Sequence, residues 1–216
     1  FGFDADKHPP YLTMALGAGS VTPLQMATGY AVFANGGYRV SPTLITKVTD
    51  QRGKVLFEAA EKPLDQSPRV IDARNAFVMG SLLQEITRTG TAARAQATLK
   101  RPDLYGKTGT TNDAVDAWFV GYQPTLVAAA WVGYDTPRNL GSRETGGGLS
   151  LPIWIDYMRV ALKDAPIARN DPPSGMVQAT ANGATEWIKV EDLDRLQEFD
   201  FDQNDTQADD AAFDIF

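Results

Sequence analysis

The chain has 216 residues, of which 43% are hydrophobic and 22% charged, and this composition is typical of a globular domain. It has no cysteine and one histidine, which excludes disulfides and thiol chemistry and argues against a histidine-based triad or metal cluster. The net charge of −7 is concentrated in residues 199–216, which hold six aspartates and no basic residue, so the rest is nearly neutral and no basic stripe indicates nucleic-acid binding. No apolar run approaches the roughly 18 residues of a membrane helix.

The N-terminal third predicts one helix and a small hairpin. Thr22 followed by Pro23 is typical of a helix start, and Asn35 with two glycines ends that helix. Short strands are expected over residues 38–40, 44–50 and 55–57, the last two forming a hairpin around an Arg52-Gly53 turn. His8, beside two prolines, is expected to be a surface loop residue.

A second helix is expected to begin at Asp72 and end near Gly90, because Met79, Leu82, Leu83 and Ile86 keep helical spacing. The sequence Arg88-Thr89-Gly90-Thr91 at its end is superficially similar to K-T-G-T. We interpret it as a helix C-terminus, where a basic residue and a glycine are expected.

Residues 104–111, with the sequence L-Y-G-K-T-G-T-T, predict a strand with a polar edge. Glycines weaken an ordinary strand but allow another backbone to come close. Lys107 can hold a carboxylate, Thr108 and Thr110 can donate or accept hydrogen bonds, and N–H groups near Gly109 can point at an oxyanion. The alternative is a plain edge strand whose lysine discourages aggregation.

The remaining elements follow in order. Strands are expected over residues 117–122 and 126–134, the second as a buried central strand, so that three antiparallel strands are neighbours. A loop over 136–148 precedes a helix that starts at Pro152, with Leu151, Ile155, Met158 and Leu162 on one face. Residues 176–180 and 187–190 are expected to be edge strands. A domain boundary is expected near Asp164, separating 1–163 from 164–216, and the acidic end is expected to be solvated and mobile.

K-T-G-T preceded by glycine and followed by two hydrophobic strands resembles the penicillin-binding protein transpeptidases and serine β-lactamases. Further ordered matches make the chain similar to class A penicillin-binding proteins, the bifunctional peptidoglycan glycosyltransferases and DD-transpeptidases, over residues 1–163. These matches are 16–24, 30–38, 116–122, 131–135 and 146–155.

The resemblance implies an α/β (α+β) fold of the penicillin-binding protein and serine β-lactamase type, a five-stranded antiparallel sheet flanked by helices. It implies an acyl-serine reaction on D-Ala-D-Ala stem peptides, which β-lactams imitate, without metal or cofactor. Lys107 would bind the substrate carboxylate, Thr108 and Thr110 would hydrogen-bond the substrate, and Gly109 would keep the strand clear. The backbone N–H of Thr110 would supply one oxyanion donor.

The nucleophile of that family is not expected in this chain. None of the serines is followed by lysine three places on or by asparagine two places on; they are Ser20, Ser41, Ser67, Ser81, Ser142, Ser150 and Ser174. We therefore expect an N-terminal segment of the same protein to supply the S-x-x-K and S-x-N elements, a glycosyltransferase domain and a membrane anchor. The family implies the periplasmic side of the bacterial cytoplasmic membrane.

Three other interpretations compete with this one. A P-loop needs glycine where the chain has Arg101, and no helix pattern follows Thr111. An EF-hand beginning at Asp200 lacks its glycine and its final glutamate. A degenerate transpeptidase-like module that binds stem peptides or partners without catalysis stays open.

Trp118 and Tyr122 are possible cleft residues, but aromatic packing in the core is favoured.

Overall fold

The computed structural model describes residues 1–198 except 9, 18, 61, 142–143 and 182–183. The chain forms two compact units, Phe1–Pro173 and Ser174–Phe216. No helix in the described part of the chain combines the length and the apolar character needed to cross a membrane. The acidic end, residues 199–216, and the EF-hand interpretation that depended on it lie outside the described residues.

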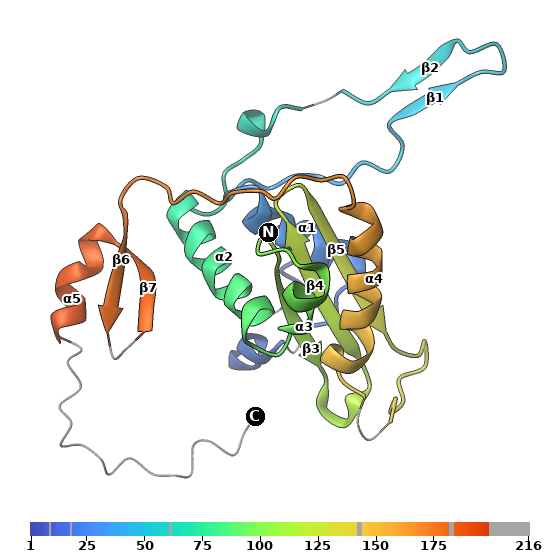
Figure 1. Ribbon diagram of the computed structural model, residues 1–216. Helices are drawn as coiled ribbons and strands as arrows, with labels where there is room; N and C mark the ends of the chain where they lie inside the picture. The colour runs from blue at the N-terminus through green and yellow to red at the C-terminus, as the bar shows by residue number, and fades with distance from the viewer. Residues whose placement is uncertain (9, 18, 61, 142–143, 182–183, 199–216) are drawn as a thin grey trace. The chain divides into compact units, whose positions relative to one another are not determined.

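An antiparallel sheet forms the centre of the first unit (Figure 1). Its strands are β3 (Tyr105–Thr110), β4 (Ala117–Gln123) and β5 (Leu126–Val132), in the order β3-β4-β5. The three neighbouring antiparallel strands were predicted correctly, but the prediction that the third is the buried central strand is wrong. The central strand is β4, which is buried along most of its length, whereas the small side chains of β5 stay partly exposed. The described sheet has three strands, where the resemblance implied five.

Helices cover both faces of this sheet (Figure 1). Tyr122 points toward α1 (Pro23–Ala34) and α2 (Ala73–Arg88), where it packs with Leu83 and Tyr105. Phe119 points the other way and packs against α3 (Arg94–Leu99) and α4 (Leu151–Ala161). The opposite directions follow from the two-residue period of a strand, because positions 119 and 122 differ by an odd number.

Local signals account for the helix starts. Thr22 accepts a hydrogen bond from Gln25 N and the Gln25 side chain accepts one from Thr22 N, a complete capping box. The Asp72 side chain caps α2 through Arg74 N.

The predicted inward face of α4 is confirmed, since Leu151, Ile155, Met158 and Leu162 are all buried. Residues 146–150, however, form a turn of π-helix (Gly146–Ser150) that leads into α4, where only a loop was expected up to Gly148.

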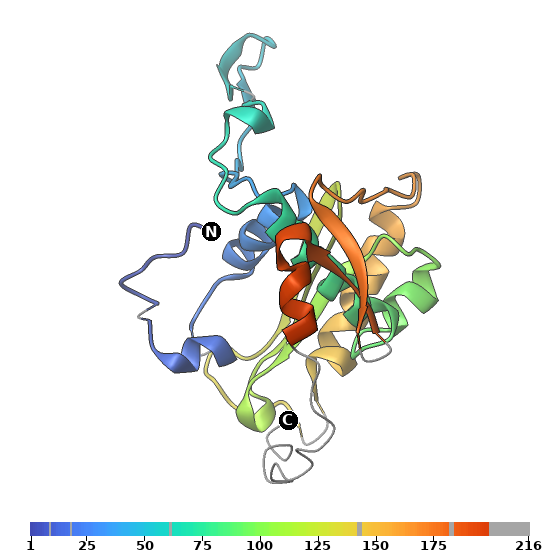
Figure 2. The same ribbon diagram turned by 90° about the vertical axis from the view of Figure 1, so that its left-hand side faces the viewer.

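The predicted hairpin is present as β1 (Lys47–Thr49) and β2 (Val55–Glu58). Its residues are exposed, and both views show it projecting from the rest of this unit (Figures 1 and 2). The strand predicted at 38–40 is wrong. The Asn35 side chain binds both the N–H and the carbonyl of Tyr38, and positive φ angles at Gly36 and Gly37 make a tight turn, so Tyr38 forms only a single bridge with Arg69.

The second unit contains the two strands predicted after residue 175. They are β6 (Met176–Ala181) and β7 (Ala184–Lys189), which pair antiparallel, and α5 (Leu193–Glu198) follows. Thr180 and Thr185 face each other across the pair, with their hydroxyls 2.8 Å apart. The expected boundary near Asp164 stays a prediction.

Candidate active site

Strand β3 carries the polar residues that the sequence singled out, and it lies at one edge of the sheet. Its only strand neighbour among the described residues is β4, with Lys107 opposite Val120 and Thr108 opposite Phe119. Gly106 is required by this pairing, because a Cβ there would lie 2.6 Å from the Phe119 ring and 2.9 Å from Val120 O. The strand is therefore held on one side and open to an extended ligand on the other.

The hydrogen-bond pattern decides which backbone groups of β3 face that open edge. Thr111 N–H donates to Asp116 O, so Thr111 points its backbone groups toward β4. Successive residues of an antiparallel strand alternate in this respect, so those of Gly109 and Lys107 also face β4. The N–H and carbonyl groups of Thr108 and Thr110 consequently point outward. The Thr110 N–H has the direction that an oxyanion donor needs.

Lys107 brings a positive charge to the same edge. Its side chain is exposed, and Nζ donates to Thr108 O at 3.0 Å, one of the carbonyls that point outward. No carboxylate in the described part of the chain forms an ion pair with it. The ammonium therefore retains donors for an anionic ligand.

The hydroxyls of Thr108 and Thr110 lie on the opposite face of the strand from Lys107, as alternation predicts. Thr110 Oγ1 accepts a hydrogen bond from Gly146 N at 3.0 Å, and Thr108 Oγ1 lies 3.1 Å from Thr91 Oγ1. Gly109 faces Trp118, whereas Gly146 packs against the backbone of Gly109 from the other side. Sequence reasoning missed Thr91, which it assigned to a helix end, and placed Gly146 in a loop without assigning it a role at the site.

The tyrosines near this strand belong to the core. Tyr105 and Tyr122 stack with ring centroids 4.7 Å apart, and both are almost fully buried. Burial raises the pKa of Tyr122 far above its ordinary value and raises the pKa of Tyr30 to about 12, so these rings stay neutral. The preference for core packing over a cleft role is confirmed for Tyr122. Trp118 is partly buried and tilts against Trp131.

A buried ion pair fixes the segment that leads into β3. The Arg101 guanidinium binds Asp103 through Nε at 3.0 Å and Nη2 at 2.8 Å, and it donates to the carbonyls of Ala165 and Pro166. Asp103 Oδ2 also accepts from Gln123 and from the N–H of Ala168. Burial alone would raise the pKa of Asp103, but its hydrogen bonds with Arg101, Ala168 and Gln123 hold that pKa below its usual value.

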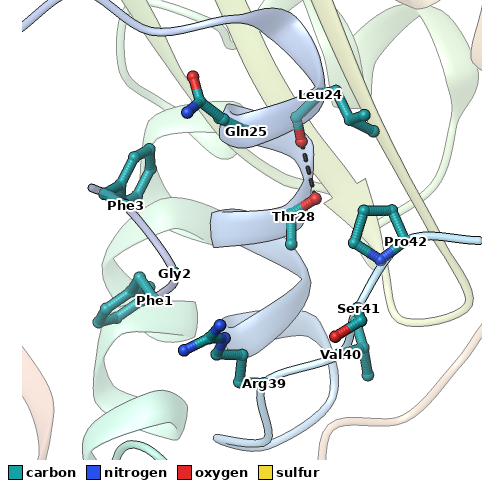
Figure 3. Close-up of a pocket in the computed structure, with 10 residues that line it drawn as sticks. All are labelled: Phe1, Gly2, Phe3, Leu24, Gln25, Thr28, Arg39, Val40, Ser41 and Pro42. Atoms are coloured by element: carbon teal, nitrogen blue, oxygen red, sulfur yellow. Dashed lines mark hydrogen bonds between the residues drawn. The ribbon is translucent and has the colours of Figure 1, made fainter.

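Other candidate positions contribute nothing to this edge. Ser150 is fully buried and donates to Ala117 O at 2.7 Å, so it is part of the core rather than an accessible nucleophile. A cavity of about 170 Å³ lies between the N-terminal segment, α1 and residues 39–42 (Figure 3). It shares no residue with β3, and the Thr28 hydroxyl in its wall is already bound to Leu24 O. His8 is half-buried against the Phe3 ring, not fully at the surface as predicted.

The sequence profile of the penicillin binding protein transpeptidase domain matches residues 9–158 of this chain. The chain belongs to this transpeptidase family. It is 47% identical over 192 residues to penicillin-binding protein 1A of Neisseria flavescens, an alignment that covers 88% of this chain and 23% of that protein. It is 38% identical to penicillin-binding protein 1A of Pseudomonas aeruginosa, over 86% of this chain and 28% of that protein.

Solved structures of penicillin-binding proteins agree with the fold. The crystal structure of penicillin-binding protein 1A from Haemophilus influenzae matches with a TM-score of 0.79 and 33% identity, over 87% of this chain and 35% of that one. PonA1 from Mycobacterium tuberculosis matches with a TM-score of 0.66 and 30% identity, over 81% of this chain and 45% of that one. The resemblance to class A penicillin-binding proteins and the α+β transpeptidase fold are thus confirmed. The chain spans about a quarter of the length of the two curated relatives.

Proposed function

We propose that this chain supplies the substrate-binding edge of a serine-type D-Ala-D-Ala transpeptidase that cross-links peptidoglycan. The observation that carries the proposal is the open edge of β3, where the Lys107 ammonium and the outward N–H of Thr110 lie on one strand. A transpeptidase substrate needs both groups, because its terminal carboxylate is anionic and its reacting carbonyl becomes an oxyanion. Membership of the transpeptidase family supports the assignment.

The reaction we propose is acyl transfer in two steps. A serine Oγ from a longer protein that contains this chain attacks the carbonyl carbon between the two terminal D-alanines, the C–N bond breaks, and terminal D-alanine leaves with a proton on its nitrogen. An amine of a second stem peptide then attacks the ester, forms the cross-link and returns the proton to the serine. A β-lactam acylates the same serine without an easy second step.

Four residues of β3, Lys107 to Thr110, take part in this proposal. The substrate runs along the open edge of β3, where Lys107 binds its terminal carboxylate from one face of the strand and the hydroxyls of Thr108 and Thr110 donate to it from the other. The Thr110 N–H stabilises the oxyanion, and losing one such donor typically slows an enzyme about 100- to 1000-fold. Gly109 keeps the strand clear for the ligand. No metal or cofactor takes part in this scheme.

The setting follows from the same proposal. The longer protein would be a bifunctional enzyme with a peptidoglycan glycosyltransferase domain, anchored in the bacterial cytoplasmic membrane with this domain on the periplasmic side. Its partners would be stem peptides of lipid-linked precursor and of existing peptidoglycan, with β-lactams as covalent inhibitors.

The test is to treat the longer protein with benzylpenicillin, digest it and locate the penicilloyl group by mass spectrometry. We expect one acylated serine, in a peptide that lies outside the 216 residues of this chain. Lys107→Gln should lower the second-order rate constant of acylation roughly 10- to 100-fold, as loss of a charged hydrogen bond predicts. Lys47→Gln, on the exposed hairpin, is the matched control and should stay within about twofold.

A longer protein with an intact S-x-x-K element that takes up no penicillin would overturn the enzymatic proposal. The binding module without catalysis would then be the better explanation, and stem-peptide binding that depends on Lys107 would identify it.

A further inference from the structure

The turn between α2 and α3 brings a side chain to the K-T-G-T strand. Thr91 Oγ1 lies 3.1 Å from Thr108 Oγ1, a hydrogen bond in which either oxygen can be the donor. A third segment lies beside them. The position of a Cβ on Gly147 is 3.5 Å from Thr91 O and 3.9 Å from Thr108 Cγ2.

The turn that carries Thr91 is well anchored. Ala92, the next residue, is fully buried, and its N–H donates to Ile86 O at 3.1 Å. Gly90 N–H donates to Glu85 O, and a Cβ on Gly90 would lie 2.9 Å from Ile86 Cα, so the chain is tightly folded back on α2. Thr91 therefore has a defined position, although its side chain is exposed.

Counting donors gives the Thr91–Thr108 contact a direction when an anion is present. Each hydroxyl has one proton to donate, and a carboxylate can only accept. If Thr108 gives its proton to Thr91, it has none left for a bound carboxylate. If Thr91 donates to Thr108, the Thr108 proton is free to point at the ligand.

The same count of donors and acceptors fixes the orientation of the Thr110 hydroxyl. Gly146 N–H can only donate, so Thr110 Oγ1 must accept from it and keeps its own proton free. Thr110 is thus oriented by a backbone group and Thr108 by a side chain that mutation can remove.

We propose that Thr91 is a positioning residue of the active site, which donates to Thr108 Oγ1 so that the Thr108 hydroxyl donates to the carboxylate of the stem peptide or β-lactam. The inference rests on the function proposed above. It gives a role to the Arg88-Thr89-Gly90-Thr91 turn, which sequence reasoning had assigned to a helix end alone.

The experiment measures acylation of the longer protein by benzylpenicillin in four forms: wild type, Thr91→Val, Thr108→Val and the double variant. Thr91→Val should slow acylation about 3- to 10-fold, the range expected for one neutral hydrogen bond. The double variant should be no slower than Thr108→Val, because Thr91 acts only through Thr108. Thr91→Ser keeps the hydroxyl and should stay within about twofold of wild type.

Thr89→Val is the matched control. It removes a hydroxyl from the same turn, but Thr89 Oγ1 is bound to the Glu85 side chain and not to β3. Acylation by this variant should stay within about twofold of wild type. A second readout is the methyl ester of benzylpenicillin, which lacks the carboxylate charge. The Thr91→Val loss should shrink below about twofold with the ester, whereas a fold defect would slow both compounds equally.

The outcomes separate this inference from the proposed function. No acylation of the wild-type protein would refute the proposed function. Normal wild-type acylation with an unaffected Thr91→Val variant would refute the role of Thr91 alone. Losses that add in the double variant, or a thermal midpoint of Thr91→Val that falls with its activity, would also refute it. Thr91→Ala provides the same comparison if the valine variant misfolds.

Discussion

At the scale of single residues, Gly146 is a position where the structure leaves no room for a side chain. A Cβ at this position would lie 2.3 Å from Trp118 O and 2.6 Å from Gly109 O, both backbone atoms of paired strands that cannot shift without disturbing the sheet. We expect Gly146→Ala to lower the free energy of unfolding by about 2 kcal/mol, as overpacking does in other cores. Denaturant unfolding measures the change.

Gly147 provides the control for this prediction. The nearest atom to its Cβ position is 3.5 Å away, an ordinary contact, so Gly147→Ala should change the free energy of unfolding by less than about 0.5 kcal/mol. Equal losses in the two variants would mean that any side chain disturbs the turn. The close packing of Gly146 on Gly109 would then not be its cause.

The sequence could predict only those residues of the candidate site that lie next to one another in the chain. K-T-G-T was recognisable because its residues are consecutive, and strand alternation placed Lys107 and the threonines on opposite faces. Thr91 and Gly146 were not recognisable, because they reach β3 from 17 and 36 residues away. Nothing in a local pattern distinguishes a helix-ending R-T-G-T from one that also contacts another strand.

At the scale of elements, Arg101 and Asp103 join the start of β3 to the end of β4 and to the segment after α4. The Asp103 side chain is 2% exposed and the Arg101 side chain 12%. Asp103→Asn replaces a carboxylate that accepts hydrogen bonds from several donors by an amide. The NH₂ group of that amide would face some of those donors. Removing one partner of a buried pair typically costs 3–5 kcal/mol, so we expect a loss of about 3 kcal/mol at pH 7.

The pH dependence of that loss follows from the lowered pKa of Asp103. The unfolded carboxyl titrates near pH 3.9, and the folded one titrates lower. The stabilisation is therefore complete above the unfolded pKa and is lost as pH falls through the folded pKa. Unfolding measured at several pH values should show the wild type and Asp103→Asn converging below about pH 4.

The control is Asp156→Asn, in an exposed pair with Arg159 on α4. The Asp156 side chain is 70% exposed, so this change should cost less than about 0.5 kcal/mol. A loss from Asp103→Asn that is equally small, or independent of pH, would contradict the stabilising role of the buried carboxylate.

Element boundaries were predictable where the cause is local. Thr22 with Pro23, and Asp72, identified helix starts through their own caps. The predictions failed where tertiary contacts decide. Residues 126–134 have the composition of a central strand, but burial depends on what lies beside a strand, and in this sheet β4 has neighbours on both edges. Residues 38–40 favour a strand by composition, but the Asn35 side chain bonds hold them in a turn.

At the scale of the whole molecule, the hydrogen bonds of the segment after α4 bear on where the transpeptidase domain ends. Sequence composition favoured a boundary near Asp164, and the family profile ends at residue 158. Residues 165–168, however, hydrogen-bond to Arg101 and Asp103 through the carbonyls of Ala165 and Pro166 and the N–H of Ala168. We therefore propose that the domain needs these residues and that its functional end lies at the junction of the two compact units, after Pro173.

Two truncations of the longer protein distinguish these boundaries. Ending the chain after Pro173 removes the second unit and leaves every described partner of Arg101 and Asp103, so acylation by benzylpenicillin should stay within about twofold of wild type. Ending it after Asp164 removes hydrogen-bond partners of Arg101 and Asp103, which should lower the free energy of unfolding by about 2–3 kcal/mol. For a domain of this size that should lower the thermal midpoint by roughly 5–10 °C. Equal midpoints for the two truncations would place the boundary at Asp164, as composition alone suggested.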